Sequence, residues 1–171
     1  MSVSGPTRST AGELVGTAPE EGREVIRAFL SEEEERAWTG LLQTHEALVR
    51  ELDARLVAEH NMPLSTFEAL MHIAHAEEGT IAISELAERI RLSPSHVSRV
   101  VIELERQGFV ERQRSSTDSR STRATITEAG RKQLRVAGGT YLSTIRALLL
   151  DPLGEREVKQ LVRIWDRIGA H

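Results

Sequence analysis

The sequence predicts a mainly α-helical fold with a small β-wing, in which a winged helix-turn-helix domain is combined with a helical dimerisation bundle. Two short helical patterns separated by a tight turn lie at residues 84–107. Two β-prone runs, at residues 109–114 and 122–126, flank a polar, turn-prone stretch and predict a hairpin. Long amphipathic patterns before and after this region carry apolar faces that a small domain has no room to bury.

The composition is that of a globular protein without membrane segments. Of the 171 residues, 39% are hydrophobic and 28% are charged, and no apolar run approaches the roughly 20 residues of a membrane span. The N-terminus lacks the apolar core of a signal peptide, so we expect a cytoplasmic protein with no membrane association. The absence of cysteine excludes disulfides and thiol-based redox sensing.

The chain divides into four parts by its patterns. Residues 1–22 are rich in Ser, Thr, Gly and Pro and are expected to form a disordered arm. Residues 23–62 and 128–171 are expected to form N-terminal and C-terminal dimerisation helices, and residues 63–127 the winged helix-turn-helix domain. Residues 25–30 predict either a strap on a partner subunit or a helical turn on their own subunit.

The first long helix is expected to begin at a capping box. Ser31 and Glu34 have the spacing at which each side chain binds the other residue's free amide. One apolar stripe then runs over about 28 residues, on the order of 40 Å at helical rise, until Asn61-Met62-Pro63 ends the helix. The stripe consists of Trp38, Leu41, Leu42, His45, Leu48, Val49, Leu52 and Leu56. Its length predicts pairing with the terminal helices of a second subunit.

The next segment is expected to support the helix-turn-helix. We interpret the stretch Leu64-Ser65-Thr66-Phe67-Glu68 as a second capping box, opening a helix that ends before Gly79. The inward residues of this helix are Phe67, Leu70, Met71 and Ala74. Ile81-Ala82-Ile83 predicts a third strand beside the wing. Ser84 is expected to cap a short helix over residues 84–90, with Leu86, Ala87 and Ile90 on its buried side.

Ser93-Pro94 is a strong start signal for the second helix of the pair. Serine caps free amides, and proline is already bent for the first helical position. Helical spacing predicts one buried side, made of Val97, Val100, Val101 and Leu104. The opposite side carries Ser95, Arg99, Ile102 and Arg106, and Gln107-Gly108 ends the helix.

Short polar and cationic groups near the start of such a helix are suited to base edges in a DNA major groove. The base-reading candidates here are Ser95, His96, Ser98 and Arg99. Ser93 is expected to be a cap first and a phosphate contact second.

The hairpin carries the other DNA-binding candidates, Arg114 and Arg120. An arginine at the tip, Arg120, is expected to enter the adjacent minor groove, where the negative potential is deepest. Asp118 would be repelled by phosphate, so we expect it to shape the turn and to pair with Arg112, Arg114 or Arg120.

The charge of the chain is segregated. The net charge is −4, yet residues 89–123 hold eight arginines against four acidic residues. Such segregation orients a protein on a polyanion and limits non-specific binding elsewhere.

The C-terminal part predicts two more helices. Thr127 is expected to cap a long helix whose apolar residues are Leu134, Tyr141, Leu142, Ile145, Leu148 and Leu149. Gly138-Gly139 costs this helix roughly 1 kcal/mol per residue relative to alanine, so a bend or a close helix crossing is expected there. Residues 151–154 interrupt the pattern, and a final amphipathic helix carries Val158, Leu161, Val162, Trp165 and Ile168.

Several runs of the sequence resemble the MarR (multiple-antibiotic-resistance regulator) family. They are Leu92–Arg99, Leu104–Arg112, and Asp118-Ser119-Arg120 closing on Thr125–Gly130. The D-x-R followed by x-[LI]-T-x-x-G is the most specific of these matches, and Ser119 stands where many members carry a second arginine. The resemblance implies a pocket between the dimer bundle and the winged domain, where small aromatic acids or phenols bind and release DNA. Its candidate lining residues are Trp38, His45, Phe67, Met71 and His72, with ordinary core packing as the alternative interpretation.

The expected function is sequence-specific transcriptional regulation by a homodimer, most simply a repressor on a palindromic double-stranded DNA operator. The alternative is a winged-helix protein-interaction module on a helical dimer without specific DNA binding. His72 and His75 with His45 or Glu68 could bind zinc, but no cysteine or H-E-x-x-H pattern supports this, so we expect no metal and no cofactor. No nucleophile elbow, Walker loop, dinucleotide fingerprint or paired-carboxylate arrangement occurs, so we expect no enzymatic activity.

Overall fold

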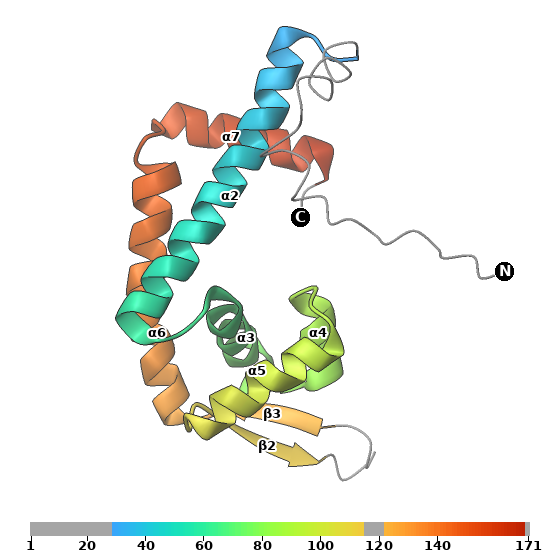
Figure 1. Cartoon of the computed structure of the whole chain (residues 1–171), viewed down its shortest axis with the longest axis vertical. Coiled ribbons are helices and arrows are strands. Elements are labelled where there is room, and N and C mark those ends of the chain that lie inside the picture. The colour runs from blue at the N-terminus through green and yellow to red at the C-terminus, as the bar shows by residue number, and fades with distance from the viewer. Residues whose placement is uncertain (1–28, 115–121, 170–171) are drawn as a thin grey trace, which may run out of the picture. The chain divides into compact units, whose positions relative to one another are not determined.

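The computed structural model describes residues 29–114 and 122–169 and has the predicted fold class (Figure 1). The described residues fall into two units, which divide between Ala47 and Leu48. The elements are α2 (Glu32–His60), α3 (Leu64–His75), η2 (Glu77–Gly79), β1 (Thr80–Ala82), α4 (Ile83–Arg89), α5 (Pro94–Arg106), β2 (Val110–Arg114), β3 (Thr122–Ile126), α6 (Glu128–Ile145), η3 (Arg146–Leu150) and α7 (Glu155–Ile168). The arm predicted at residues 1–22 and most of the segment at 25–30 lie outside the described residues.

The predicted capping box opens α2. The backbone N–H and the hydroxyl of Ser31 both donate to Glu34 Oε2 at 2.8 Å, and the N–H of Glu34 donates to Ser31 Oγ at 3.3 Å. These hydrogen bonds lower the pKa of Glu34, and the one from the backbone N–H of Ser31 has the largest effect. In the described part of the first unit, Trp38 is 50% exposed and His45 is exposed.

The core of the second unit lies where α3, α4 and α5 pack against the sheet. Each of these helices contributes the apolar side chains of one face to the core, as the helical periodicity predicts. Its members of 2% exposure or less include Leu56, Met62, Phe67, Ala69, Leu70, Ile73, Ile81, Leu86, Val97, Val101, Leu104, Val110 and Ala124. All four apolar residues predicted for the buried side of α5 are buried.

The sheet has three antiparallel strands in the order β1-β3-β2. Ala124, at the middle of β3, is paired with Ile81 on one side and Arg112 on the other. The predicted third strand is therefore confirmed, although it ends at Ala82 and Ile83 already belongs to α4.

Two predicted caps are wrong. Ser65 does not cap α3, because that helix begins at Leu64, directly after Pro63. The N–H of Leu64 instead donates to Asp53 Oδ1 of α2 at 2.8 Å. Ser84 does not cap α4, since Ala82 precedes the helix with an extended backbone and no side-chain cap. In the first case a distant residue supplies the acceptor, and in the second the pairing of β1 with β3 sets where the helix starts.

Thr127 caps α6 as predicted, with its Oγ1 accepting from the N–H of Gly130 at 3.0 Å. The helix runs through Gly138-Gly139 without interruption, and a Cβ built at either glycine meets nothing within 4 Å. The close crossing predicted at these glycines is thus not found in the part of the chain that the structure describes.

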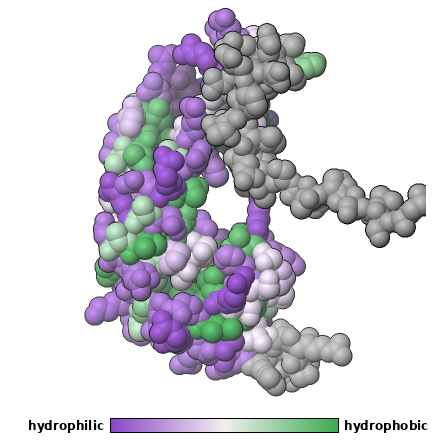
Figure 2. All heavy atoms as spheres, in the orientation of Figure 1, coloured by the Kyte–Doolittle hydropathy of each residue, from purple (hydrophilic) through white to green (hydrophobic). Residues whose placement is uncertain are grey.

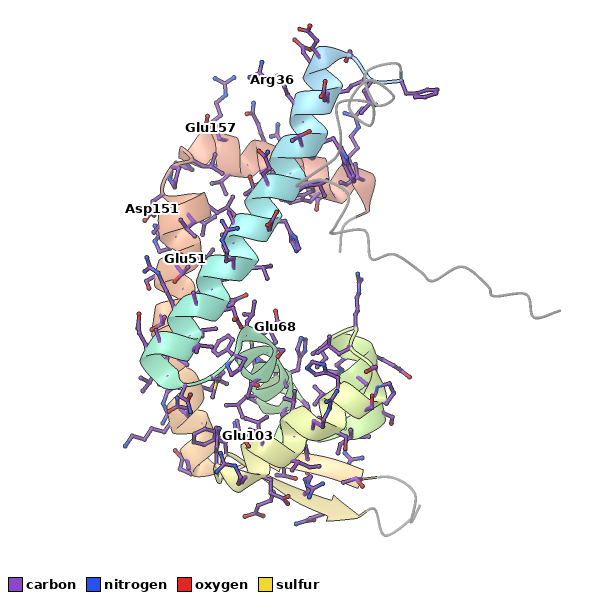
Figure 3. The ribbon with its side chains drawn as sticks, in the orientation of Figure 1. Arg36, Glu51, Glu68, Glu103, Asp151 and Glu157 are labelled. Atoms are coloured by element: carbon purple, nitrogen blue, oxygen red, sulfur yellow. The ribbon has the colours of Figure 1, made fainter. Side chains whose placement is uncertain are left out.

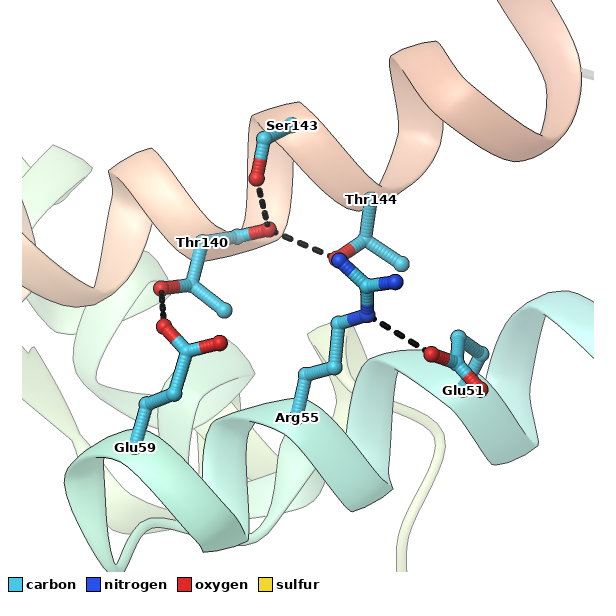
Figure 4. Close-up of polar contacts among 6 residues, drawn as sticks. All are labelled: Glu51, Arg55, Glu59, Thr140, Ser143 and Thr144. Carbon is cyan, nitrogen blue, oxygen red and sulfur yellow. Dashed lines mark hydrogen bonds and ion pairs between the residues drawn. The ribbon is translucent and has the colours of Figure 1, made fainter.

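Thr140, which directly follows Gly139, makes a polar contact between α6 and α2 (Figure 4). The Thr140 hydroxyl donates to Glu59 Oε2 at 2.6 Å, so at 2.8 Å from His60 Nε2 it accepts the imidazole proton. The exposed part of α6 and α7 is rich in apolar side chains, and Figure 2 shows hydrophobic side chains among hydrophilic ones on the visible face. Those more than half exposed are Val136, Leu142, Val162, Ile164 and Ile168.

Candidate nucleic-acid interface

The start of α5 is built as its sequence predicts. Ser93 Oγ accepts from the backbone N–H of His96 at 3.3 Å, and Pro94 occupies the first turn. The hydroxyls of Ser93 and Ser95 lie 3.2 Å apart, and both residues are exposed at this end of the helix. This end of the helix therefore offers two hydroxyl groups to solvent beside a helix N-terminus, where phosphate groups bind.

The four base-reading candidates share the N-terminal half of α5. Ser95 and Arg99 are exposed, while His96 and Ser98 are half-buried. Arg99 makes no ion pair with any other described residue, so its guanidinium is available to an acceptor outside the chain. Arg99 lines a shallow groove between the start of α3 and α5. The residues that line this groove are Pro63, Ser65, Thr66, His96, Arg99, Val100 and Glu103.

The acidic side chain of Glu103, labelled on α5 in Figure 3, is neutralised within its own helix. Arg106 donates to it through Nε at 2.8 Å and Nη2 at 2.6 Å, and Gln107 donates at 2.6 Å. The hydrogen bonds from Arg106 first, and then from Gln107, lower the pKa of Glu103 to about 2. Glu103 is therefore ionised at neutral pH, and Arg106 is committed to it.

A second ion pair joins α5 to the wing. Arg112 of β2 donates through Nε to Glu105 Oε2 at 2.7 Å, and its Nη2 lies 2.6 Å from the same oxygen. The side-chain hydrogen bond from Arg112 lowers the pKa of Glu105. We predicted Asp118 as one partner for Arg112 and missed Glu105, although opposite charges seven residues apart across a helix-to-strand turn could have indicated it.

The wing tip lies outside the described residues, so the predictions for Asp118 and Arg120 stay predictions. The backbone of Arg114 ends β2 opposite Thr122. Two further arginines, Arg91 and Arg123, are exposed and make no ion pair among the described residues. Arg91 lies in the turn of the helix-turn-helix with φ 54°, a left-handed conformation that turn chemistry did not flag for arginine.

The predicted effector residues do not share one environment. Phe67 is 2% exposed and stacks on Tyr141, with ring centroids 4.8 Å apart, so it belongs to the core. Met71 and His72 are half-buried on the same helix. Burial raises the pKa of Glu68 and also that of Tyr141.

Across residues 29–114 and 122–169, no group of three or more His, Asp or Glu side chains is placed to hold a metal ion. No helix in these ranges combines the length and the apolar character needed to span a bilayer.

Comparison with known proteins gives a consistent picture. Residues 62–122 match the model of the MarR family. The chain is 30% identical over 82 residues to the uncharacterised HTH-type transcriptional regulator YwhA of Bacillus subtilis, a match that covers 48% of this chain and 57% of that protein. It is 31% identical over 72 residues to the HTH-type transcriptional regulator SarZ of Staphylococcus haemolyticus, covering 42% and 48%. The chain thus spans about half the length of these relatives.

Solved structures extend the likeness to most of the chain. The fold is similar to that of Sco3205 of Streptomyces coelicolor, a MarR family transcriptional regulator solved in complex with DNA, with TM-score 0.75 and 26% identity over 82% of this chain and 88% of that one. The fold of AbsC from the same organism matches with TM-score 0.74 and 23% identity over 84% and 96%. The winged helix-turn-helix geometry, the match of residues 62–122 to the MarR family model and these neighbours agree, and the chain is similar to MarR family transcriptional regulators over this domain and in its fold.

Proposed function

We propose that this protein is a transcriptional regulator that binds double-stranded DNA in a sequence-specific manner through α5 and the β2–β3 wing. The observation that carries the proposal is Arg99, an exposed arginine without an ion pair among the described residues, on the outward side of a helix whose other side is fully packed. An arginine in this position is suited to guanine O6 and N7, the commonest specific contact in the major groove.

The electrostatics of α5 support the proposal. Glu103 and Glu105 would repel phosphate if they were free, but each is bound by an arginine. The exposed Arg91 and Arg123 add positive charge around the helix and the sheet. The two glutamates of α5 are thus compensated, and three exposed arginines make no ion pair among the described residues, as suits a polyanion partner.

The second part of the proposal is a homodimer on a palindromic operator. Five apolar side chains of α6 and α7 are more than half exposed, and a second copy of this chain would cover them with the same apolar face of its own. A two-fold dimer reads two half-sites about one helical turn, ~10 base pairs, apart. Sco3205 was solved with DNA, which supports carrying DNA binding over to this chain.

The third part is repression with release by a small aromatic or phenolic effector. An effector that prefers a dimer with wrongly spaced winged domains lowers DNA affinity by its differential binding energy. Trp38, His45, Met71 and His72 remain the candidate residues for this role, and Phe67 acts as packing. A regulator of this kind acts in the cytoplasm, where the DNA is.

Selection of bound duplexes from a random pool, followed by a fluorescence-anisotropy titration on the selected operator, tests DNA binding. Arg99→Ala is expected to cost about 1–3 kcal/mol, or about 5–150-fold in Kd, and to relax the preference at one base position of each half-site. Arg163→Ala, which removes an exposed arginine of α7, is the matched control and is expected to bind with unchanged affinity and preference, with the same oligomeric state as the wild type in sedimentation because α7 belongs to the proposed dimer surface.

Two outcomes would overturn the proposal. One is Arg99→Ala binding the operator as tightly as the wild type. The other is a duplex affinity that hardly changes between 50 and 200 mM salt, because binding through several phosphates falls about 10³-fold or more over this range. A salt-independent interaction would instead favour the protein-interaction module.

A further inference from the structure

Ile102 is an apolar side chain on the otherwise polar outward side of α5. It is 45% exposed, and helical spacing puts it on the side of Arg99 three residues earlier and of Arg106 four residues later. Ile102 is not part of the core, since the buried side of α5 consists of Val97, Val100, Val101 and Leu104. A large β-branched residue at a half-exposed helix position gains little for helix formation, and its exposed apolar surface is open to a contact outside the chain.

The charged neighbours of Ile102 are held in ion pairs with other residues. Arg106 is held back along the helix by two hydrogen bonds to Glu103, at 2.6 and 2.8 Å. Glu105 is held toward the wing by Arg112. The charged side chains around Ile102 toward the C-terminus of α5 are therefore paired. Arg99, which is exposed and makes no ion pair with a described residue, lies one turn before Ile102.

The major groove presents one apolar group, the C5-methyl of thymine. Three helical residues advance about 4.5 Å, comparable with a base step of about 3.4 Å, so Ile102 reaches base pairs next to those within reach of Arg99. We propose that Ile102 contacts a thymine methyl and makes α5 select thymine within one or two base pairs of the position that Arg99 reads. This inference rests on the proposed DNA binding and adds to it a residue that determines specificity.

The test compares thymine with deoxyuridine, which lacks only the methyl group. Each thymine of the selected operator is replaced in turn, and Kd is measured by fluorescence anisotropy for the wild type, Ile102→Ala and Ile102→Leu. Burial of one methyl is worth about 0.8 kcal/mol, so the wild type is expected to lose about fourfold at one thymine per half-site. Ile102→Ala removes this contact from both half-sites, so it is expected to bind the thymine operator about 16-fold more weakly and to bind both bases equally there.

The controls separate a lost contact from a lost fold and from a failure of DNA binding itself. Ile102→Leu keeps an apolar side chain and is expected to retain the preference for thymine, while the other thymines of the same duplex show no dependence on residue 102. The inference would be overturned if Ile102→Ala discriminated thymine from deoxyuridine as the wild type does. The proposed DNA binding would still stand in that case if Arg99→Ala weakened binding. A wild-type protein that selects no duplex would overturn the proposed function and this inference together.

Discussion

Gly130 is the position where the structure leaves least room for a side chain. It is buried in the first turn of α6, and a Cβ added there would lie 2.1 Å from the carbonyl oxygen of Phe109 and 3.0 Å from Cγ1 of Ile126. The obstacle is backbone and cannot rotate away. The same carbonyl oxygen also accepts the N–H of Thr127 at 3.0 Å, so moving it loosens the junction of α5, the wing and α6.

These contacts set the magnitude expected for Gly130→Ala. Overpacking of this kind costs about 1–3 kcal/mol, and disturbing the cap at Thr127 costs about 1 kcal/mol more. Alanine returns about 1 kcal/mol through its better helix propensity. We therefore expect a net loss of about 2 kcal/mol in the free energy of unfolding.

Gly139→Ala in the same helix is the matched control. Gly139 is exposed and nothing lies within 4 Å of an added Cβ, so only the propensity acts and a gain of about 1 kcal/mol is expected. Urea unfolding at one fixed protein concentration measures both variants, with unchanged m values as the check that unfolding stays two-state. A Gly130→Ala protein as stable as Gly139→Ala would refute the reasoning.

Three further outcomes are expected. Ser93→Ala removes the N-cap of α5 and lowers the unfolding free energy by about 1 kcal/mol in the same urea assay. Arg106→Ala raises the pKa of Glu103 from about 2 toward 4.5 in a carbon-13 NMR titration, because its main hydrogen-bond donor is gone. Since folding depresses this pKa, the wild-type pair is complete at neutral pH and is lost only as the pH falls through about 2. Thr140→Val removes the hydroxyl that accepts from His60 and costs about 1 kcal/mol, again measured in urea.

Each of these has an outcome that would contradict it. Unchanged stability of Ser93→Ala would mean that water replaces the cap at no cost. An NMR pKa of Glu103 near 4.5 in the wild type would show that Arg106 does not hold it in solution. For Thr140, Thr140→Ser is the control, since it keeps the hydroxyl, and equal losses from both variants would assign the effect to packing.

The sequence predicted the helix and the exposed positions of the candidate interface, but it did not predict which of its arginines form ion pairs. The helix start at Ser93-Pro94, the buried side of α5 and the exposed positions of Ser95 and Arg99 all follow from periodicity and capping, which are properties of a few consecutive residues. Which arginines are open could not be read in the same way. Arg112 is engaged by Glu105 across the helix-to-strand turn, and only the packed structure brings these side chains together.

What the sequence alone determined about this protein is the part governed by contacts within about four residues. The caps at Ser31, Ser93 and Thr127 are such contacts, because donor and acceptor are held close whatever the rest of the chain does. The tertiary structure decided the rest. The start of α3 depends on Asp53, eleven residues away, and the junction of α2 with α6 depends on the Thr140–Glu59 contact across 81 residues. No local pattern encodes such partners, because their separation in space is set by the packing of the whole core.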